Sequence, residues 1–167
     1  MNTIWADTAL LSTGWQKNVQ IDVDQNGCIS SIKPDTAPEG YRVGILLPAP
    51  SNLHSHGFHR ALAGLSEHRA GGSEDDFWTW RWVVYRFLDL LKREDIQAIT
   101  AFAQMEMLES GFAAVAEFHY VHHHPGGLQY ENIAENSCRI TAASEETGNG
   151  LTLLPGFYQY GGGDKRE

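Results

Sequence analysis

The sequence predicts an α/β fold, in which a parallel β-sheet with crossover helices follows a β-rich N-terminal segment. From residue 45 onward, apolar strand-like runs alternate with helical patterns in the order β-α-α-β-α-β, which is typical of a parallel sheet with right-handed crossovers. Residues 1–44 instead contain short strand-like segments that are separated by turns. We therefore expect two parts, residues 1–44 and residues 45–167.

The first part has the pattern of a small sheet with one solvated face. Ile4–Ala6 is strand-like, and apolar residues alternate with polar ones over Val19–Val23. Asn26 and Gly27 form a strong hairpin-turn signal, after which Cys28–Ile32 is the natural return strand.

The second part begins with a continuous apolar run, Ile45–Pro48, which predicts a strand buried on both faces. Helical periodicity and glycine end signals then predict three helices and two further strands. The helices are expected at 77–91, from 93 to just before Gly111, and at 130–146, and the strands at 112–118 and 151–155.

Length and charge restrict the classes of function. The 167 residues suffice for a hydrophobic core but exclude a complete α/β barrel, which takes about 250 residues. With 12 basic and 21 acidic residues the net charge is −9, which argues against nucleic acid or an anionic membrane as partner. No apolar run is long enough to span a membrane, no signal peptide is recognised, and the two cysteines form no metal or redox spacing. We expect a cytoplasmic protein with small-molecule or protein partners.

The clearest chemical signal is His54-Ser55-His56, which follows the apolar run. Residues i and i+2 of an extended chain point to the same side, so both imidazoles can reach one ion. Carboxyl ends of strands are where α/β folds place their sites, and imidazole nitrogen suits zinc. The alternative interpretation is two polar loop residues at the exit of a strand.

A longer set of motifs resembles the amidohydrolase superfamily and, within it, the formimidoylglutamate deiminase family. The resemblance runs in order over about residues 45–158 and does not depend on the histidine pair alone. Its blocks are Leu46–Phe58, Arg60–Leu65, Phe77–Arg81, Met105–Phe112, Ala114–Tyr120 and Gly150–Pro155.

This resemblance implies a TIM-type (β/α)8 metal-dependent hydrolase barrel, of which about the first three strands are present, preceded by part of a small β-sandwich. It implies a zinc-dependent hydrolysis of N-formimino-L-glutamate, a formimino amino acid, to N-formyl-L-glutamate and ammonia. His54 and His56 match the first two zinc ligands of the family, whereas the other ligands and the proton-transfer residues belong to later strands. Members of the family are commonly homodimers.

Three further residues match substrate-contacting positions of the family. Arg81 matches a residue that binds a substrate carboxylate, a role that suits the guanidinium fork. Tyr120 matches a tyrosine near the substrate, and His59 stands where the family usually has glutamine. Without the resemblance, Arg81 reads as a surface arginine and Tyr120 as a partly buried aromatic residue.

Other polar residues in this region are expected to be less important. His119, His122, His123 and His124 are interpreted as a polar loop near the mouth of the site rather than as a ligand cluster. Glu117 is expected to point into the barrel without a direct role.

Two alternatives remain open at the level of sequence. The chain could be a non-enzymatic metal-binding or interaction module, or part of a different deaminase of the same superfamily, although the block Phe77–Arg81 argues against the latter. Catalytic zinc sites typically have three ligands from the protein, whereas this chain offers two. We therefore expect the chain by itself to be inactive and to bind zinc weakly.

Overall fold

Two sheets organise the chain, a four-stranded sheet in the unit Met1–Ala49 and a three-stranded sheet in the unit Pro50–Glu167. The computed structural model describes residues 2–67 and 76–158. No helix in these two ranges is both long enough and apolar enough to cross a membrane.

The first sheet has the strand order β3-β2-β1-β4. It confirms the predicted hairpin, because β2 and β3 pair in antiparallel fashion around the turn at Asn26 and Gly27. A cluster of buried residues, Ala6, Ala9, Val19 and Ile21, holds the sheet together. The strands are β1 (Asn2–Leu11), β2 (Gly14–Val23), β3 (Ile29–Lys33) and β4 (Tyr41–Leu46).

The prediction of a buried strand at Ile45–Pro48 that leads into the second part is wrong. Ile45 belongs to β4, which lies parallel to β1 in the first sheet, and 68% of its surface is exposed. Hydropathy alone cannot tell which strand an apolar run pairs with. Pro48 and Pro50 cannot donate backbone hydrogen bonds and end the ladder, so the two units divide between Ala49 and Pro50 rather than after residue 44.

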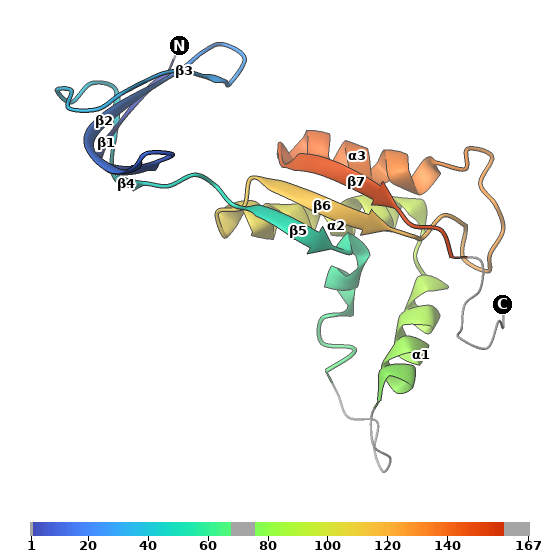
Figure 1. Cartoon of the computed structure of the whole chain (residues 1–167). Coiled ribbons are helices and arrows are strands. Elements are labelled where there is room, and N and C mark those ends of the chain that lie inside the picture. Colours follow the sequence, from blue (N-terminus) through green and yellow to red (C-terminus); the bar gives the residue numbers. More distant parts are fainter. Residues whose placement is uncertain (1, 68–75, 159–167) are drawn as a thin grey trace. The chain divides into compact units, whose positions relative to one another are not determined.

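The second unit confirms the predicted α/β fold with a parallel sheet, in the strand order β5-β6-β7. Helices α2 and α3 lie along one face of this sheet (Figure 1). The elements are β5 (Ser51–Ser55), the 3-10 helix η1 (Gly57–Leu62), α1 (Phe77–Leu88), α2 (Arg93–Glu109), β6 (Ala114–His119), α3 (Glu135–Thr147) and β7 (Gly150–Pro155).

The glycine end signals of the two long helices are confirmed. Gly111 and Gly148 follow α2 and α3 with φ of +89° and +76°, a region that favours glycine. The start of α3 differs from the prediction, because Tyr130–Ala134 precede the helix. The amide of Ala134 donates to the side chain of Asn132 in the turn before it.

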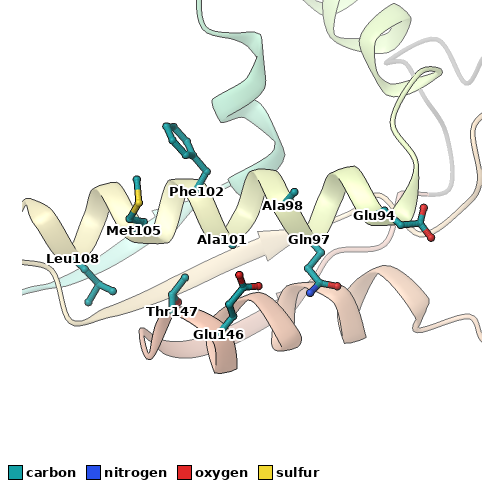
Figure 2. A pocket seen from close by; sticks show the side chains of 9 residues that line it. All are labelled: Glu94, Gln97, Ala98, Ala101, Phe102, Met105, Leu108, Glu146 and Thr147. Carbon is teal, nitrogen blue, oxygen red and sulfur yellow. The ribbon is translucent and has the colours of Figure 1, made fainter.

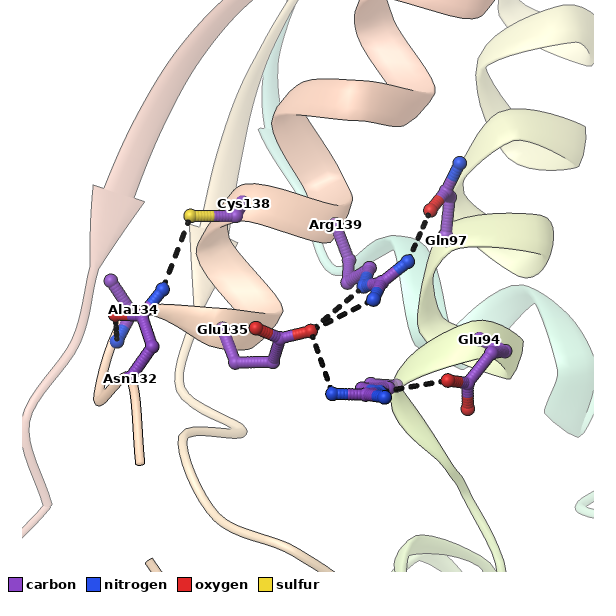
Figure 3. Close-up of polar contacts among 8 residues, drawn as sticks. Glu94, Gln97, Asn132, Ala134, Glu135, Cys138 and Arg139 are labelled. Atoms are coloured by element: carbon purple, nitrogen blue, oxygen red, sulfur yellow. Dashed lines mark hydrogen bonds and ion pairs between the residues drawn. The ribbon is translucent and has the colours of Figure 1, made fainter. Parts of the chain in front are cut away.

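Ion pairs and hydrogen bonds join the N-terminal ends of α2 and α3 (Figure 3). Glu135 accepts from Arg139 one turn away at 2.9 Å and from Arg93 of α2 at 3.4 Å. Arg139 also donates to Gln97 of α2 at 3.2 Å. These contacts fix the two helices against each other at the end where β6 and β7 also end.

The second unit also has an apolar core. Phe58 and Leu62 of η1, Val84 of α1, Leu91, Ile96 of α2 and Ile140 of α3 form one buried cluster. Because η1 directly follows β5, this core fixes the segment that comes after the His-Ser-His motif.

Polar groups are also buried between the sheet and the helices. Gln104 of α2 donates to Ser144 of α3 at 2.7 Å and accepts from Thr147 at 2.8 Å. His119, the last residue of β6, is 2% exposed, and its Nε2 has no hydrogen-bond partner among the described residues. Burial, with a smaller contribution from the charge of His122, lowers the pKa of His119 from 6.5 to about 4.

We predict that Ile140→Ala destabilises the second unit because it leaves a cavity in the apolar core. The free energy of unfolding should fall by about 2–5 kcal/mol, measured by urea denaturation. The matched control is Ile133→Ala, since 66% of the surface of Ile133 is exposed, and it should change the free energy by less than about 0.5 kcal/mol. Equal losses in the two variants would contradict this core.

We predict that His119 makes the protein less stable as the pH falls. The unfolded chain takes up a proton on His119 below about pH 6.5, but the folded protein resists protonation until about pH 4, so stability is lost across this window. From about pH 7.5 to 5 the contribution is about 2 kcal/mol.

The measurement compares wild type with His119→Gln by urea denaturation at several pH values. The difference between the two proteins isolates His119 from other titrating groups. The free energy of unfolding of wild type should fall by about 2 kcal/mol more than that of the variant between pH 7.5 and 5. Equal losses in the two proteins would show that His119 is not responsible.

Candidate functional site

His54 and His56 lie together at the carboxyl end of β5. Their Nε2 atoms are 3.1 Å apart, and their ring centres are 4.8 Å apart. Ser55, between them, points to the opposite side of the sheet and is buried. The period of two in an extended strand therefore brings the two imidazoles to one side, as the sequence predicts.

The neighbouring strand β6 orients the ring of His56. Nδ1 of His56 lies 2.9 Å from the carbonyl oxygen of Phe118. Because a carbonyl oxygen only accepts, Nδ1 carries the proton and Nε2 presents its lone pair toward His54. The ring of Phe118 also packs against that of His54, at 4.7 Å between centres.

This pair fits two ligands of a single metal ion. Zinc–nitrogen bonds are about 2.0–2.1 Å long, so one ion can contact two nitrogens that are 3.1 Å apart. A carbonyl that fixes the Nδ1–H form is the usual support of a ligating histidine. Within residues 2–67 and 76–158 no group of three or more His, Cys, Asp or Glu side chains could hold a metal.

His59 and Tyr120 form a second pair next to the first. The Tyr120 hydroxyl lies 3.1 Å from Nε2 of His59. Burial and then the charge of His56 lower the pKa of His59 to about 4, while burial raises the pKa of Tyr120 to about 12. At neutral pH both groups are therefore uncharged, and each can exchange hydrogen bonds without adding charge to the site.

Arg81 lies on α1, the helix that Asp76 caps by accepting from the amides of Trp78 and Thr79. Its Nε and Nη2 donate to the hydroxyl of Tyr85 one turn later, at 3.0 and 2.5 Å. The guanidinium also lies 5.1–5.9 Å from the ring centres of Phe77, Trp78 and Tyr85. The aromatic residues thus hold the cation on one side of the helix.

One cavity of about 630 Å³ brings four of the five predicted site residues together. His56, His59, Arg81 and Tyr120 line it, and His54 stands beside it in contact with His56. The rest of the lining comes from α1, from the loop after β6 and from the segment after β7, namely Phe77, Trp80, Val84, Tyr85, Leu88, Asp89, Val121–Gly127 and Tyr158.

The histidine-rich segment, residues 119–124, consists of the buried end of β6 and the start of the loop that follows it. His119 belongs to β6, whereas His122, His123 and His124 line the cavity from the loop that follows. His122 donates through Nε2 to the carbonyl of Gly156 at 2.7 Å, and His124 packs on Tyr130 at 3.6 Å between ring centres. These three histidines thus act as loop residues of the cavity wall.

Glu117, which was expected to point into the barrel, lies instead on the face of the sheet that α2 covers. Glu117 alternates with Phe118 along β6, so it faces α2, and it is 2% exposed. Its Oε1 accepts from the amide of Gly57 at 2.5 Å. Sequence reasoning missed this contact, although a carboxylate within an otherwise apolar strand segment was a signal for it.

A separate groove of about 720 Å³ lies along α2 and the end of α3 (Figure 2). Its described lining is mostly apolar and has no histidine, cysteine or basic side chain. The lining residues are Glu94, Gln97, Ala98, Ala101, Phe102, Met105, Leu108, Glu146 and Thr147. We therefore place the candidate site at the histidine pair instead.

Comparisons with known proteins identify relatives of the chain. Residues 1–41 match the family model described as "Formimidoylglutamate deiminase HutF, N-terminal domain". Over 164 residues the chain is 46% identical to formimidoylglutamate deiminase of Pseudomonas aeruginosa. This match covers 97% of the chain and 36% of the relative. The chain thus spans about a third of the length of that curated relative.

Solved structures with a similar fold were also found. An amidohydrolase from Brucella melitensis superimposes with a TM-score of 0.90 at 40% identity, over 99% of this chain and 37% of that one. Atrazine chlorohydrolase from Arthrobacter aurescens, complexed with zinc, superimposes with a TM-score of 0.62 at 16% identity, over 93% of this chain and 35% of that one, which shows a shared fold alone. Over nearly its whole length, the chain is therefore similar to part of a formimidoylglutamate deiminase and to part of a solved amidohydrolase, and its first 41 residues match the N-terminal domain of the deiminase family.

Proposed function

We propose that this chain supplies the first part of the active site of a zinc-dependent hydrolase, which deiminates N-formimino-L-glutamate to N-formyl-L-glutamate and ammonia. The observation that carries the proposal is the convergence of the Nε2 atoms of His54 and His56 beside a cavity lined by Arg81, His59 and Tyr120. The 46% identity to the Pseudomonas aeruginosa deiminase supports the choice of substrate.

The proposed architecture is the beginning of a (β/α)8 barrel, preceded by part of a small β-sandwich. Parallel strands β5, β6 and β7, with α2 and α3 on one face, are what the first three strands of such a barrel require. In this arrangement the uncovered face is the interior of the barrel. His54 and His56 then point inward at the carboxyl end of the first strand, where barrel enzymes carry out their chemistry.

His54 and His56 would hold the zinc ion through their Nε2 atoms. The chemistry that zinc supplies in such a site is Lewis-acid activation of water at neutral pH. The chain contributes the orientation of these ligands, because the carbonyl of Phe118 fixes the Nδ1–H form of His56 and leaves Nε2 available.

Arg81 would bind a carboxylate of the substrate. Its guanidinium carries a permanent charge and a planar fork that matches a carboxylate. The hydroxyl of Tyr85 holds Nε and Nη2 within the wall of the cavity, so the substrate meets an arginine that is already oriented. Such preorganisation lowers the entropy lost on binding.

His59 and Tyr120 would contact the formimino group. An amidine is basic and readily positive, so a protonated histidine beside it would repel it. The lowered pKa of His59 keeps the ring neutral near pH 7. His59 would therefore hydrogen-bond as a neutral group, like the glutamine that the family usually has at this position.

We predict that the isolated 167-residue chain releases no ammonia from N-formimino-L-glutamate. The described residues offer two histidines to the metal, one fewer than typical catalytic zinc sites take from the protein. A coupled ammonia assay with the purified chain and added zinc measures this. Robust turnover would disprove the view that the site needs further residues.

We predict that Arg81 controls substrate affinity in a chimera, in which this chain replaces the corresponding part of the Pseudomonas aeruginosa deiminase. The unmodified chimera should hydrolyse N-formimino-L-glutamate in preference to aminopurines and aminotriazines. Arg81→Lys should lower kcat/KM about 10- to 100-fold, since a charged hydrogen bond is worth about 1.5–3 kcal/mol.

The matched control is Arg86→Lys on the same helix, where the side chain is exposed and lies outside the cavity lining. It should leave kcat/KM within about twofold of the unmodified chimera, as expected for a surface position. Equal losses of kcat/KM in the two variants would show that Arg81 does not bind the substrate. A preference of the unmodified chimera for aromatic bases would contradict the proposed substrate and favour a different deaminase.

A further inference from the structure

We propose that Glu117 is a positioning residue, which holds the His-Ser-His segment in the conformation that brings the two imidazoles together. The inference rests on the proposed metal site but concerns a residue outside the set of ligands. It starts from the position of a buried carboxylate on the strand next to β5.

The first observation is that Glu117 contacts both neighbours of His56. Its Oε1 accepts from the amide of Gly57 at 2.5 Å, and it also accepts a hydrogen bond from the side chain of Ser55. Ser55 and Glu117 are paired residues of β5 and β6. One side chain thus fixes the backbone on each side of His56, from the face of the sheet opposite to its ring.

The second observation is that the site for this carboxylate is shaped to hold it. A Cβ atom at Gly57 would lie 3.3 Å from Oε1 of Glu117 and 3.1 Å from Oγ1 of Thr100, which is 1% exposed. Glycine at position 57 therefore lets the carboxylate approach the backbone, and α2 covers it from behind.

The third observation concerns the energetic cost of this arrangement. Burial raises the pKa of Glu117, while the hydrogen bonds from Gly57 and Ser55 act in the opposite direction. A leucine or valine would fill an ordinary strand position against a helix without this cost. The structure places the carboxylate where its hydrogen bonds act on the segment that carries His54 and His56.

Residues 117 and 118 thus hold His56 from two sides. Glu117 fixes the backbone through Ser55 and Gly57, and the carbonyl of Phe118 fixes the ring through Nδ1. If the backbone around His56 relaxes, Nδ1 moves out of reach of that carbonyl and the Nε2 atoms no longer converge. Supporting groups of this kind typically change metal affinity about 10- to 100-fold.

The test compares four variants of this chain with wild type: Glu117→Ala, Glu117→Gln, Ser55→Ala and Val115→Ala. The first readout is the nitrogen NMR spectrum of the imidazoles, which reports the Nδ1–H form of His56 without any metal. The second is the apparent dissociation constant for zinc, followed by titration of the same signals.

Glu117→Ala should abolish the preference of His56 for the Nδ1–H form and weaken zinc binding at least about tenfold. Glu117→Gln should restore both readouts, since the amide oxygen still accepts from Gly57 and the amide group can bond to the Ser55 hydroxyl. Ser55→Ala should give an intermediate effect.

Val115→Ala is the matched control, because Val115 is 2% exposed and lies on the same face of β6. It should lower stability but leave the ring signals and the zinc affinity at their wild-type values. Equal effects of Val115→Ala and Glu117→Ala, or no effect of Glu117→Ala, would overturn the proposal.

Two further outcomes are informative. If Glu117→Ala does not fold, Ser55→Ala decides, and unchanged ring signals in that variant would overturn the proposal. If wild type binds no zinc while the ring signals of His56 still depend on Glu117, the positioning role stands and the proposed metal function fails.

Discussion

The pairing of Ser55 with Glu117 is the constraint on which the candidate site depends. Side chains of a strand alternate between two faces, so this one register sends Ser55 and Glu117 toward α2 and sends His54 and His56 to the opposite face. A slip of one residue would exchange the faces and bury the imidazoles beneath the helix. The same register is supported by the parallel pairing of β6 with β7 and by the apolar core around Ile140.

The electrostatic character of the cavity follows from burial rather than from the number of histidines. Burial lowers the pKa of His59, so this ring stays neutral beside Tyr120, while Arg81 on α1 brings a permanent positive charge to the wall. The cavity thus combines the uncharged pair His59 and Tyr120 with the cationic Arg81, and Asp89 also lines it. In the proposed function, a carboxylate of the substrate would meet Arg81, and its formimino group would meet the uncharged pair.

Local rules predict much of this structure, and long-range pairing accounts for what they miss. Strand periodicity correctly predicts that His54 and His56 share a side, and glycine end signals correctly predict where α2 and α3 end. The run at Ile45–Pro48 was misassigned because hydropathy does not reveal that β4 pairs with β1. The orientation of Glu117 was missed for a related reason, since it depends on the helix that covers its face of the sheet and on the amide of Gly57.

The bond from His56 to the carbonyl of Phe118 has a consequence for how this site tolerates change. The acceptor belongs to the main chain, so any residue at position 118 provides it, and a drift in side-chain identity there leaves the imidazole in the same tautomer. Position 117 has no such freedom, because its contribution depends on a side-chain oxygen. Two adjacent residues that hold the same ring thus differ sharply in the number of amino acids that each position can accept.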